Sequence, residues 1–243
     1  MKMDIILRRK IIIRRKMMIN LLLSLNNFDE DWCYEKLKSI IKENHKVLII
    51  PFSYHDKWLA NIECWNRAFN KLNGTHYKEI ISPFLSYGIN EDNIKWINQF
   101  IDSEEVMKEK INSTDIIFFT GGYPDKMMYK FKKYNIIDEL EKFDGIVIGT
   151  SAGAMVQISE FHITQDCDYD DYSYHKGLNM IDNFDIEVHF ANTEIQNISI
   201  LRAIRENKKP VYSITNQGAV LVLNSEVHLL GDSKLWKVPK LNF

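Results

Sequence analysis

Residues 144–156 read DGIVIGTSAGAMV and change character in the middle. The first half is an apolar run rich in β-branched residues, which predicts a buried strand. A G-x-S-x-G turn, Gly149 to Gly153, follows, and a helical pattern begins directly after it. A strand, a tight turn and a helix in that order are the context in which this motif presents a nucleophilic serine. We therefore expect Ser151 to be a nucleophile.

Small residues have a physical role in such a turn. Gly149 and Gly153 carry no side chain that would keep the strand and the helix apart. The helix directs free N–H groups at Ser151, which favours negative charge there. The motif alone leaves an alternative open, a plain strand-to-helix connection that happens to contain a serine.

A second glycine turn lies about 30 residues upstream. Residues 114–119 (TDIIFF) predict another buried strand, which ends in Gly121-Gly122 before a helix that starts near Asp125. The spacing fits one βαβ unit, so the two strands should be parallel neighbours with both turns at one sheet edge. A glycine there can offer its N–H to an oxyanion together with the N–H of Ala152. A plain βα turn is the alternative, but the two motifs together favour a serine-nucleophile site.

Composition excludes several classes of function. The chain has 243 residues, is 45% hydrophobic and has a net charge of −2, an ordinary globular balance without a bias towards nucleic acid. No apolar run approaches the ~20 residues of a membrane span. The scattered Cys33, Cys64 and Cys167 predict reduced thiols and a cytoplasmic location. We expect no nucleic-acid or membrane partner, and the sequence leaves open whether the protein is a homo-oligomer.

The N-terminus is basic. Residues 1–17 carry seven lysines and arginines among isoleucines, which partly resembles a secretory signal. The apolar stretch Ile19–Leu25 is short, however, and no small-residue cleavage site follows it. We expect residues 1–17 to be a basic extension without an assigned role, either non-native or disordered. We expect residues 18–243 to form one α/β domain that begins with a core strand at Ile19–Leu25.

Strand-like and helix-like segments alternate along the chain. Strands are predicted at 46–52, 76–82, 114–119, 144–149, 184–190, 211–215, 219–223 and 227–230, the last two as a hairpin; helices are predicted at 30–43, 57–72, 90–101, 104–111, 125–134 and 195–207. This order predicts a doubly wound, mostly parallel sheet with helices on both faces and a short C-terminal β-hairpin. Ligands of such sheets bind beyond the carboxyl ends of the strands.

An acidic and aromatic segment follows the elbow at 165–177. It is either a solvated loop or a flap beside the site, and with Tyr123 it supplies the candidate substrate residues Asp168, Asp170 and Tyr172. Its carboxylates would attract an amine or a cationic side chain. It lacks the fixed glycine and terminal glutamate of a Ca²⁺ loop, so we predict no metal and no cofactor.

A serine nucleophile needs a base that is itself held in place by a third group. Among seven histidines, His189 ends a strand-like run and precedes a break and a helix, which places it at an edge of the sheet. His162 follows the elbow helix so closely that it could reach back only through a tight loop. We expect His189 to be the base; a buried, hydrogen-bonded strand histidine is the alternative.

These motifs carry a resemblance. Gly121-Gly122 after a strand, residues 149–153 after the next and the later His189-Phe190 resemble the S51 peptidases, a family that includes dipeptidase E and cyanophycinase. The resemblance covers roughly residues 18–231 and implies a fold similar to class I glutamine amidotransferases. It implies Ser151 as nucleophile, His189 as base, and the N–H groups of Gly122 and Ala152 as oxyanion hole. Glutaminases of the related fold use cysteine at the elbow, so Ser151 argues against glutamine hydrolysis.

Two positions depart from the family pattern. Tyr123 stands where the family usually has asparagine, and Asn216 stands where it usually has the triad glutamate. An amide oxygen can fix the tautomer of His189 but cannot stabilise an imidazolium with a full charge. Exchanging aspartate for asparagine in a serine-protease triad lowers kcat by about 10⁴. Glu187 is a candidate substitute, because it lies two residues from His189 on the same strand face, and Glu226 is a more remote one.

Together these features predict a serine hydrolase that cleaves a small amide, foremost a short peptide, through an acyl-enzyme. One alternative is a catalytically degenerate binding or regulatory protein of the same fold, and another is an esterase or transacylase. The family preference for an N-terminal aspartate needs a cationic pocket group. The sequence assigns that role to none of the three arginines Arg67, Arg202 and Arg205.

Overall fold

The computed structural model describes residues 18–237, so the predicted basic extension at 1–17 and the last six residues, 238–243, lie outside the described chain. The elements in order are β1 (Ile19–Leu23), α1 (Tyr34–Lys38), β2 (Val47–Ile50), α2 (Ile62–Phe69), α3 (Tyr77–Ser86), η1 (Glu91–Asn93), β3 (Ile94–Trp96), α4 (Glu104–Asn112), β4 (Ile116–Phe119), α5 (Pro124–Lys133), α6 (Ile137–Lys142), β5 (Ile146–Thr150), α7 (Ala152–Met155), β6 (Glu160–Ile163), β7 (Ser173–Lys176), β8 (Asp185–Glu187), α8 (Glu194–Asn207), β9 (Val211–Leu223) and β10 (Glu226–Trp236).

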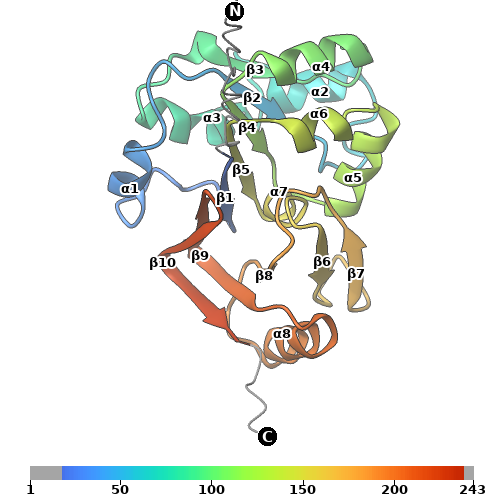
Figure 1. Cartoon of the computed structure of the whole chain (residues 1–243). Coiled ribbons are helices and arrows are strands. Elements are labelled where there is room, and N and C mark those ends of the chain that lie inside the picture. Colours follow the sequence, from blue (N-terminus) through green and yellow to red (C-terminus); the bar gives the residue numbers. More distant parts are fainter. Residues whose placement is uncertain (1–17, 238–243) are drawn as a thin grey trace, which may run out of the picture.

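A mostly parallel sheet forms the centre of the molecule (Figure 1). Its strand order is β10-β9-β1-β5-β4-β2-β3, and β8 pairs with β9 off this path. The strands from β1 to β3 are parallel, as are β8 and β9, whereas β9 runs antiparallel to β1 and β10. The predicted fold class is confirmed, including the C-terminal hairpin, which turns at Asn224-Ser225 with positive φ at both residues.

The two faces of the parallel strands bury separate apolar layers. On one face, Ile49, Phe118 and Ile148 pack with residues of α1, α2 and α3. On the other, Ile50 and Phe119 alternate with them and pack against α4, α5 and α6. Both faces are therefore covered, which explains why these strands read as continuous apolar runs.

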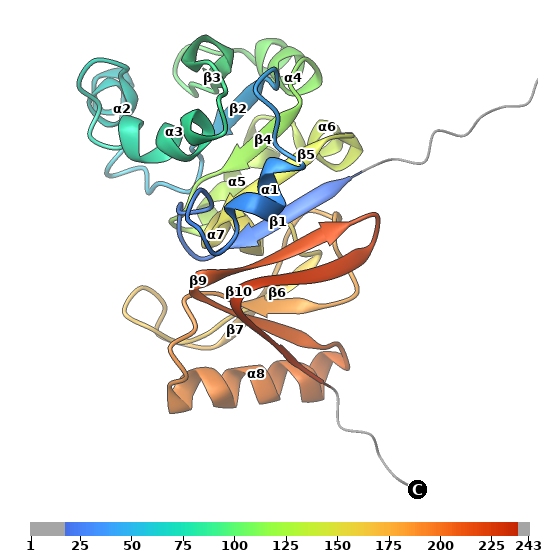
Figure 2. The ribbon, with the colours of Figure 1, turned by 90° about the vertical axis from the view of Figure 1, so that its left-hand side faces the viewer.

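Strand β9 links the parallel sheet to a second region that holds β8, α8 and the β6–β7 hairpin (Figures 1 and 2). Its second half pairs with β1, and its first half extends past the edge of β1 to pair with β8. Helix α7 lies between the two regions. The ends of β4 and β5 therefore face the loop that follows β8.

Two predicted elements are of the wrong type. Residues 77–82 lie in helix α3, not in a strand, and His76 is its N-cap residue. The helix forms because Tyr77, Ile80, Ile81 and Phe84 recur at helical spacing and are all buried. Residues 90–101 do not form a helix. They form the short turn η1 and then β3, which pairs with the edge of β2.

Other predicted bounds are too long or too short. The helices at 30–43 and 57–72 shrink to α1 and α2, since α2 begins only where the Asn61 side chain caps it by accepting the Cys64 N–H. The strands at 211–215 and 219–223 are one strand, β9. The segment at 165–177 is not entirely a loop, because its end forms β7, which pairs with β6. Within residues 18–237, no helix is both long enough and apolar enough to span a membrane.

Candidate active site

Ser151 lies on a strained bend between β5 and α7. Its backbone has φ 50° and ψ −115°, a conformation that costs a residue with a side chain on the order of 1–3 kcal/mol. Its own N–H donates to the Leu23 carbonyl at 2.8 Å, which ties the bend to β1. The hydroxyl is thereby placed beyond the carboxyl ends of β4 and β5.

Close packing explains the glycines around this bend. A Cβ on Gly149 would collide with the Gly153 carbonyl, and one on Gly153 would collide with the Phe119 carbonyl. Because Gly153 meets the end of β4 so closely, the elbow and the upstream glycine turn share one edge of the sheet. The predicted parallel pairing of β4 and β5 is confirmed.

Gly122 has a left-handed backbone beside the serine. Its φ is 136°, and a Cβ there would lie 2.8 Å from the Ser53 carbonyl. A Cβ on the adjacent Gly121 would lie 3.5 Å from the Ser151 Cβ, so the two turns touch. As the first residue of α7, Ala152 has no acceptor for its N–H within its own helix.

His189 stands on the loop after β8, exposed and with φ 51°. Its N–H donates to the Ser24 hydroxyl at 2.8 Å, and that hydroxyl donates to the Ile214 carbonyl at 2.8 Å. The Gln196 amide donates to the His189 carbonyl at 3.1 Å. Strand β9, the end of β1 and the first turn of α8 therefore all hold this backbone.

Asn216 is the partner of the His189 ring. The Nδ1 atom of His189 lies 3.0 Å from the Asn216 Oδ1 atom. The Asn216 backbone is held separately, since its carbonyl accepts from the Asn27 amide at 3.0 Å. Glu187, the predicted substitute for this role, is not bonded to His189 and faces a different histidine.

That histidine is His162 on β6, which lies buried between two carboxylates of β8. Its Nδ1 atom is 2.7 Å from Asp185 and its Nε2 atom is 2.8 Å from Glu187. The exposed fractions of these three residues are 1%, 2% and 6%. Burial alone would lower the pKa of His162, but the two carboxylates outweigh it and raise that pKa to about 10. His162 is therefore an imidazolium at neutral pH.

Two cavities meet at Ser151. The flap cavity, of about 520 Å³, is lined by Ser151, His189, Glu187, His162 and residues of the 164–169 loop. The α3 cavity, of about 320 Å³, lies beside Tyr54 and Glu79 and is also lined by Ser151, Gly122 and His189. Ser151, Gly122 and His189 border both spaces, so the predicted nucleophile, oxyanion donor and base are brought together.

The acidic segment closes one side of the flap cavity. Asp168 lines the cavity and accepts the Tyr123 hydroxyl hydrogen at 3.0 Å. Tyr169 also lines it and donates to Asp125 at 2.9 Å. Asp170 is exposed and does not line the cavity.

Tyr172 does not line the cavity either. Its ring stacks on His162 with the ring centroids 5.5 Å apart, and burial, the first cause, raises the pKa of its hydroxyl. It therefore covers the buried histidine. Of the loop candidates, only Asp168 is placed where it could touch a ligand in this cavity, and Tyr123 supports it.

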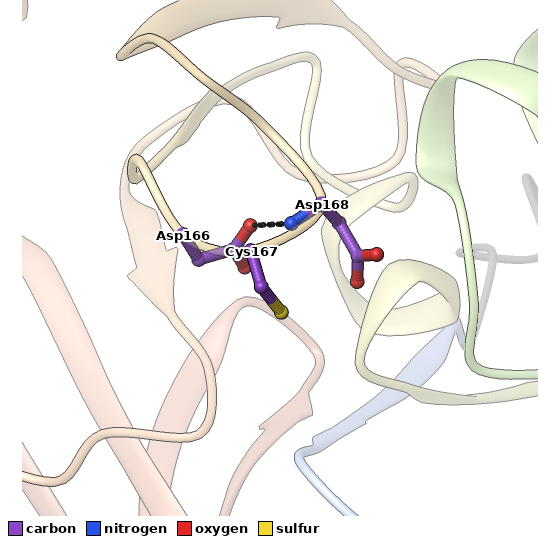
Figure 3. Close-up of side chains that lie close together, drawn as sticks. All are labelled: Asp166, Cys167 and Asp168. Atoms are coloured by element: carbon purple, nitrogen blue, oxygen red, sulfur yellow. Dashed lines mark hydrogen bonds between the residues drawn. The ribbon is translucent and has the colours of Figure 1, made fainter.

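Asp166, Cys167 and Asp168 sit together on one turn of this loop (Figure 3). Their ligand atoms lie within 4.8 Å of one another, and all three residues are exposed. One Asp166 oxygen accepts the Asp168 N–H at 2.8 Å, which is an ordinary local turn contact. These contacts hold the turn in its conformation.

Sequence reasoning missed three residues of this region. Asp185 and His162 form the buried cluster with Glu187, and Ser24 holds the His189 backbone. The alternation Asp185-Ile186-Glu187 was the available signal, since it puts two carboxylates on one face of a strand that also carries apolar residues. Two carboxylates on a buried strand need a cation, and His162 supplies it.

The family model of peptidase family S51 matches residues 26–230. The chain belongs to peptidase family S51. No curated protein sequence matches it.

Two solved structures are similar to this family member. One is a putative peptidase E protein from Listeria monocytogenes EGD-e, with 20% identity, a TM-score of 0.61, and coverage of 89% of this chain and 99% of the other. The second is a peptidase from an acI-B1 Actinobacterium, with 16% identity, a TM-score of 0.58, and coverage of 92% of each chain. At these identities the likeness shows the fold.

Proposed function

We propose that this S51 family member is a serine hydrolase that cleaves a small amide, foremost a short peptide. Ser151 attacks the carbonyl carbon and His189 takes its proton. The N–H groups of Gly122 and Ala152 stabilise the oxyanion. His189 then passes the proton to the leaving amine, and water hydrolyses the acyl-enzyme by the same route.

The observation that carries this proposal is the strained serine on the β5–α7 bend, next to Gly122 and facing the same cavities as His189. Backbone strain of this kind persists where the surrounding packing enforces it, and it concentrates at reactive sites. Within residues 18–237 the Ser151 hydroxyl forms no hydrogen bond. Such catalytic contacts often tighten only when substrate binds.

In this proposal Asn216 orients His189 and selects the tautomer that has its proton on Nδ1. The ring nitrogen that faces substrate, Nε2, is then free to accept the serine proton. The amide gives the imidazolium less stabilisation than a carboxylate would, so we expect turnover to be slow for a serine peptidase.

A screen of dipeptide and small-amide hydrolysis tests the proposal, with Ser151→Ala as the matched control. We expect at least one amide to be cleaved by the wild-type chain and not by the variant. Cleavage confined to esters, or acyl transfer to an added amine that outcompetes water, would instead establish the esterase or transacylase.

The exposed His189–Asn216 pair also favours a second candidate, a protein that keeps the cavity and has lost turnover. It predicts ligands that raise the Tm equally in the wild type and in Ser151→Ala, with no product from any substrate. Product formation that depends on Ser151 excludes it.

A further inference from the structure

The cavity beside Ser151 has an excess of negative charge. Its charged lining residues are Asp166, Asp168, Glu187 and the His162 imidazolium. Asp185 lies directly behind His162 and adds one more carboxylate. Among the described residues, neither lysine nor arginine lines this cavity or the α3 cavity. A low-dielectric space of this composition favours a positively charged group.

Glu187 has one carboxylate oxygen without a donor from the described part of the protein. Its Oε2 atom accepts from His162 and from the Thr164 hydroxyl at 2.8 and 2.7 Å. No residue between 18 and 237 donates a hydrogen bond to its Oε1 atom, although the side chain is 94% buried and lines the flap cavity. An oxygen of a mostly buried carboxylate is stabilised when a donor reaches it. The cavity is where that donor would come from.

The entrance of the flap cavity is also acidic. Asp166 and Asp168 lie on the loop that borders it, and the Tyr169 ring lines it beside them. Asp168 is held by Tyr123, which in turn contacts the rings of Trp58 and His55. Carboxylates beside an aromatic ring bind an ammonium or guanidinium group through ion pairing and contact with the ring face.

The arginines between residues 18 and 237 lie outside both cavities. Arg202 donates to Glu206 at 3.0 Å and lies over the Tyr172 ring, 4.2 Å from its centroid. Arg67 is exposed on α2, and Arg205 is exposed on α8. None of them lines either cavity, so an aspartate side chain would find carboxylates and the His162 imidazolium, which is already paired with Asp185 and Glu187.

We propose that the flap cavity binds a cationic group of the substrate, an ammonium or a guanidinium, at Glu187, with Asp166 and Asp168 at the entrance. The inference rests on the proposed function, in which this cavity holds the substrate at Ser151. It names the substrate class, an amide with a positive charge close to the scissile bond.

Calorimetric binding to the full chain carrying Ser151→Ala tests this without turnover. N-acetyl-argininamide carries a guanidinium where N-acetyl-citrullinamide carries a neutral urea. The difference in affinity between these two ligands measures the contribution of a side-chain cation. Norleucinamide has a terminal ammonium, which acetylation removes in N-acetyl-norleucinamide. The difference in affinity between these two ligands measures the contribution of a terminal ammonium. We expect at least one cationic member to bind about tenfold or more tightly than its neutral partner.

Matched variants in one loop locate the effect. The double variant Asp166→Asn/Asp168→Asn removes both charges but keeps an acceptor oxygen at each position. The oxygen at 166 can still accept the N–H of residue 168, and the oxygen at 168 can still accept the Tyr123 hydroxyl hydrogen. This variant should weaken the cation about two- to tenfold and leave the neutral partner unchanged. Asp170→Asn/Asp171→Asn, on the same loop but outside the cavity lining, should change neither.

Equal binding of charged and neutral partners, or tighter binding of an aspartyl amide, would overturn the inference. The same holds if the Asp170→Asn/Asp171→Asn control weakens the cation as much as the cavity variant does. Because no step requires acylation, failure of Ser151 to react would contradict the proposed function and leave this result standing.

Discussion

Two histidines of this chain stand near one cavity in opposite environments. His162 is buried between Asp185 and Glu187, whereas His189 is exposed and its ring contacts a neutral amide, Asn216. The two carboxylates keep His162 protonated, with its pKa raised to about 10, so it cannot accept a proton from a serine at neutral pH. The comparison teaches that both ring nitrogens of His162 are occupied by carboxylates, whereas among the described residues the exposed ring of His189 keeps one nitrogen free for the proposed role as base.

The two histidines should differ most in their effect on catalysis. His189→Ala removes the proposed base, so we expect kcat/KM to fall about 10⁴-fold or more, as when a member of a serine triad is lost. Hydrolysis of the best substrate from the dipeptide screen measures this. The Tm should stay near the wild-type value because the ring is exposed. Full activity in this variant would remove His189 from the mechanism.

The opposite result is expected at the other histidine. His162→Gln leaves two buried carboxylates without a cation, and breaking such a buried pair costs about 3–5 kcal/mol. Urea unfolding measures the loss. The triple variant that also carries Asp185→Asn and Glu187→Gln should recover part of it, since no buried charge then remains. Equal stability of wild type and His162→Gln would show that the cluster is not ionised.

The substitution Asn216→Asp makes the environment of His189 more like that of His162, because it gives the His189 ring a carboxylate partner. It places a charge where an amide now lies 3.0 Å from the His189 ring. We expect kcat to rise about tenfold or more and the acid limb of the pH–rate profile to move to higher pH, because a carboxylate stabilises the imidazolium. Asn216→Ala is the control and should lower kcat. An unchanged rate and profile in Asn216→Asp would contradict the assigned role.

The charge on His162 also predicts how stability depends on pH. Its pKa is about 10 in the folded chain against an ordinary value of 6.5, so its contribution is complete below about pH 6.5. It is lost as the pH rises through 10. The free energy of unfolding should therefore fall from pH 7 to pH 10, and the fall should be smaller in His162→Gln. Parallel curves for the two chains would argue that His162 is already neutral.

The smallest effect is expected from Ser24. Its hydroxyl accepts the His189 N–H and donates to the Ile214 carbonyl, so Ser24→Ala leaves a backbone donor unpaired. We expect a stability loss of about 1–3 kcal/mol and a severalfold lower kcat from a less fixed His189. Ser199→Ala, a buried serine on α8, is the matched control and should keep kcat. An equal loss in both variants would mean that Ser24 does not position the base.

The sequence was sufficient where the information is local. The β5–α7 elbow, the glycine turn after β4 and the helix α8 could be read because motif, periodicity and caps agree over short stretches. Short apolar runs are ambiguous, and the strand predicted at 76–82 is wrong because the buried face of α3 recurs every three or four residues. There the tertiary packing decides.

The alternation Asp185-Ile186-Glu187 marks two carboxylates on a buried strand, but their pairing with His162 could not be predicted because it joins separate segments of the chain. His162 meets Asp185 and Glu187 only because β6 packs beside β8, and no local pattern announces that pairing. The hydrogen-bond partner of the His189 ring also depends on a contact that the sequence does not show. Glu187 and Asn216 were both open from the sequence, and the position of β9 places Asn216 against the ring.

The central claim is that the Ser151 hydroxyl is the nucleophile and that His189 activates it. Intact-mass measurement after treatment with a fluorophosphonate, followed by peptide mapping, tests this most directly. We predict one adduct on Ser151 that is absent in Ser151→Ala, strongly slowed in His189→Ala and retained in folded His162→Gln. A chain that stays unlabelled at every probe concentration, or an adduct that maps to another residue, would contradict the account.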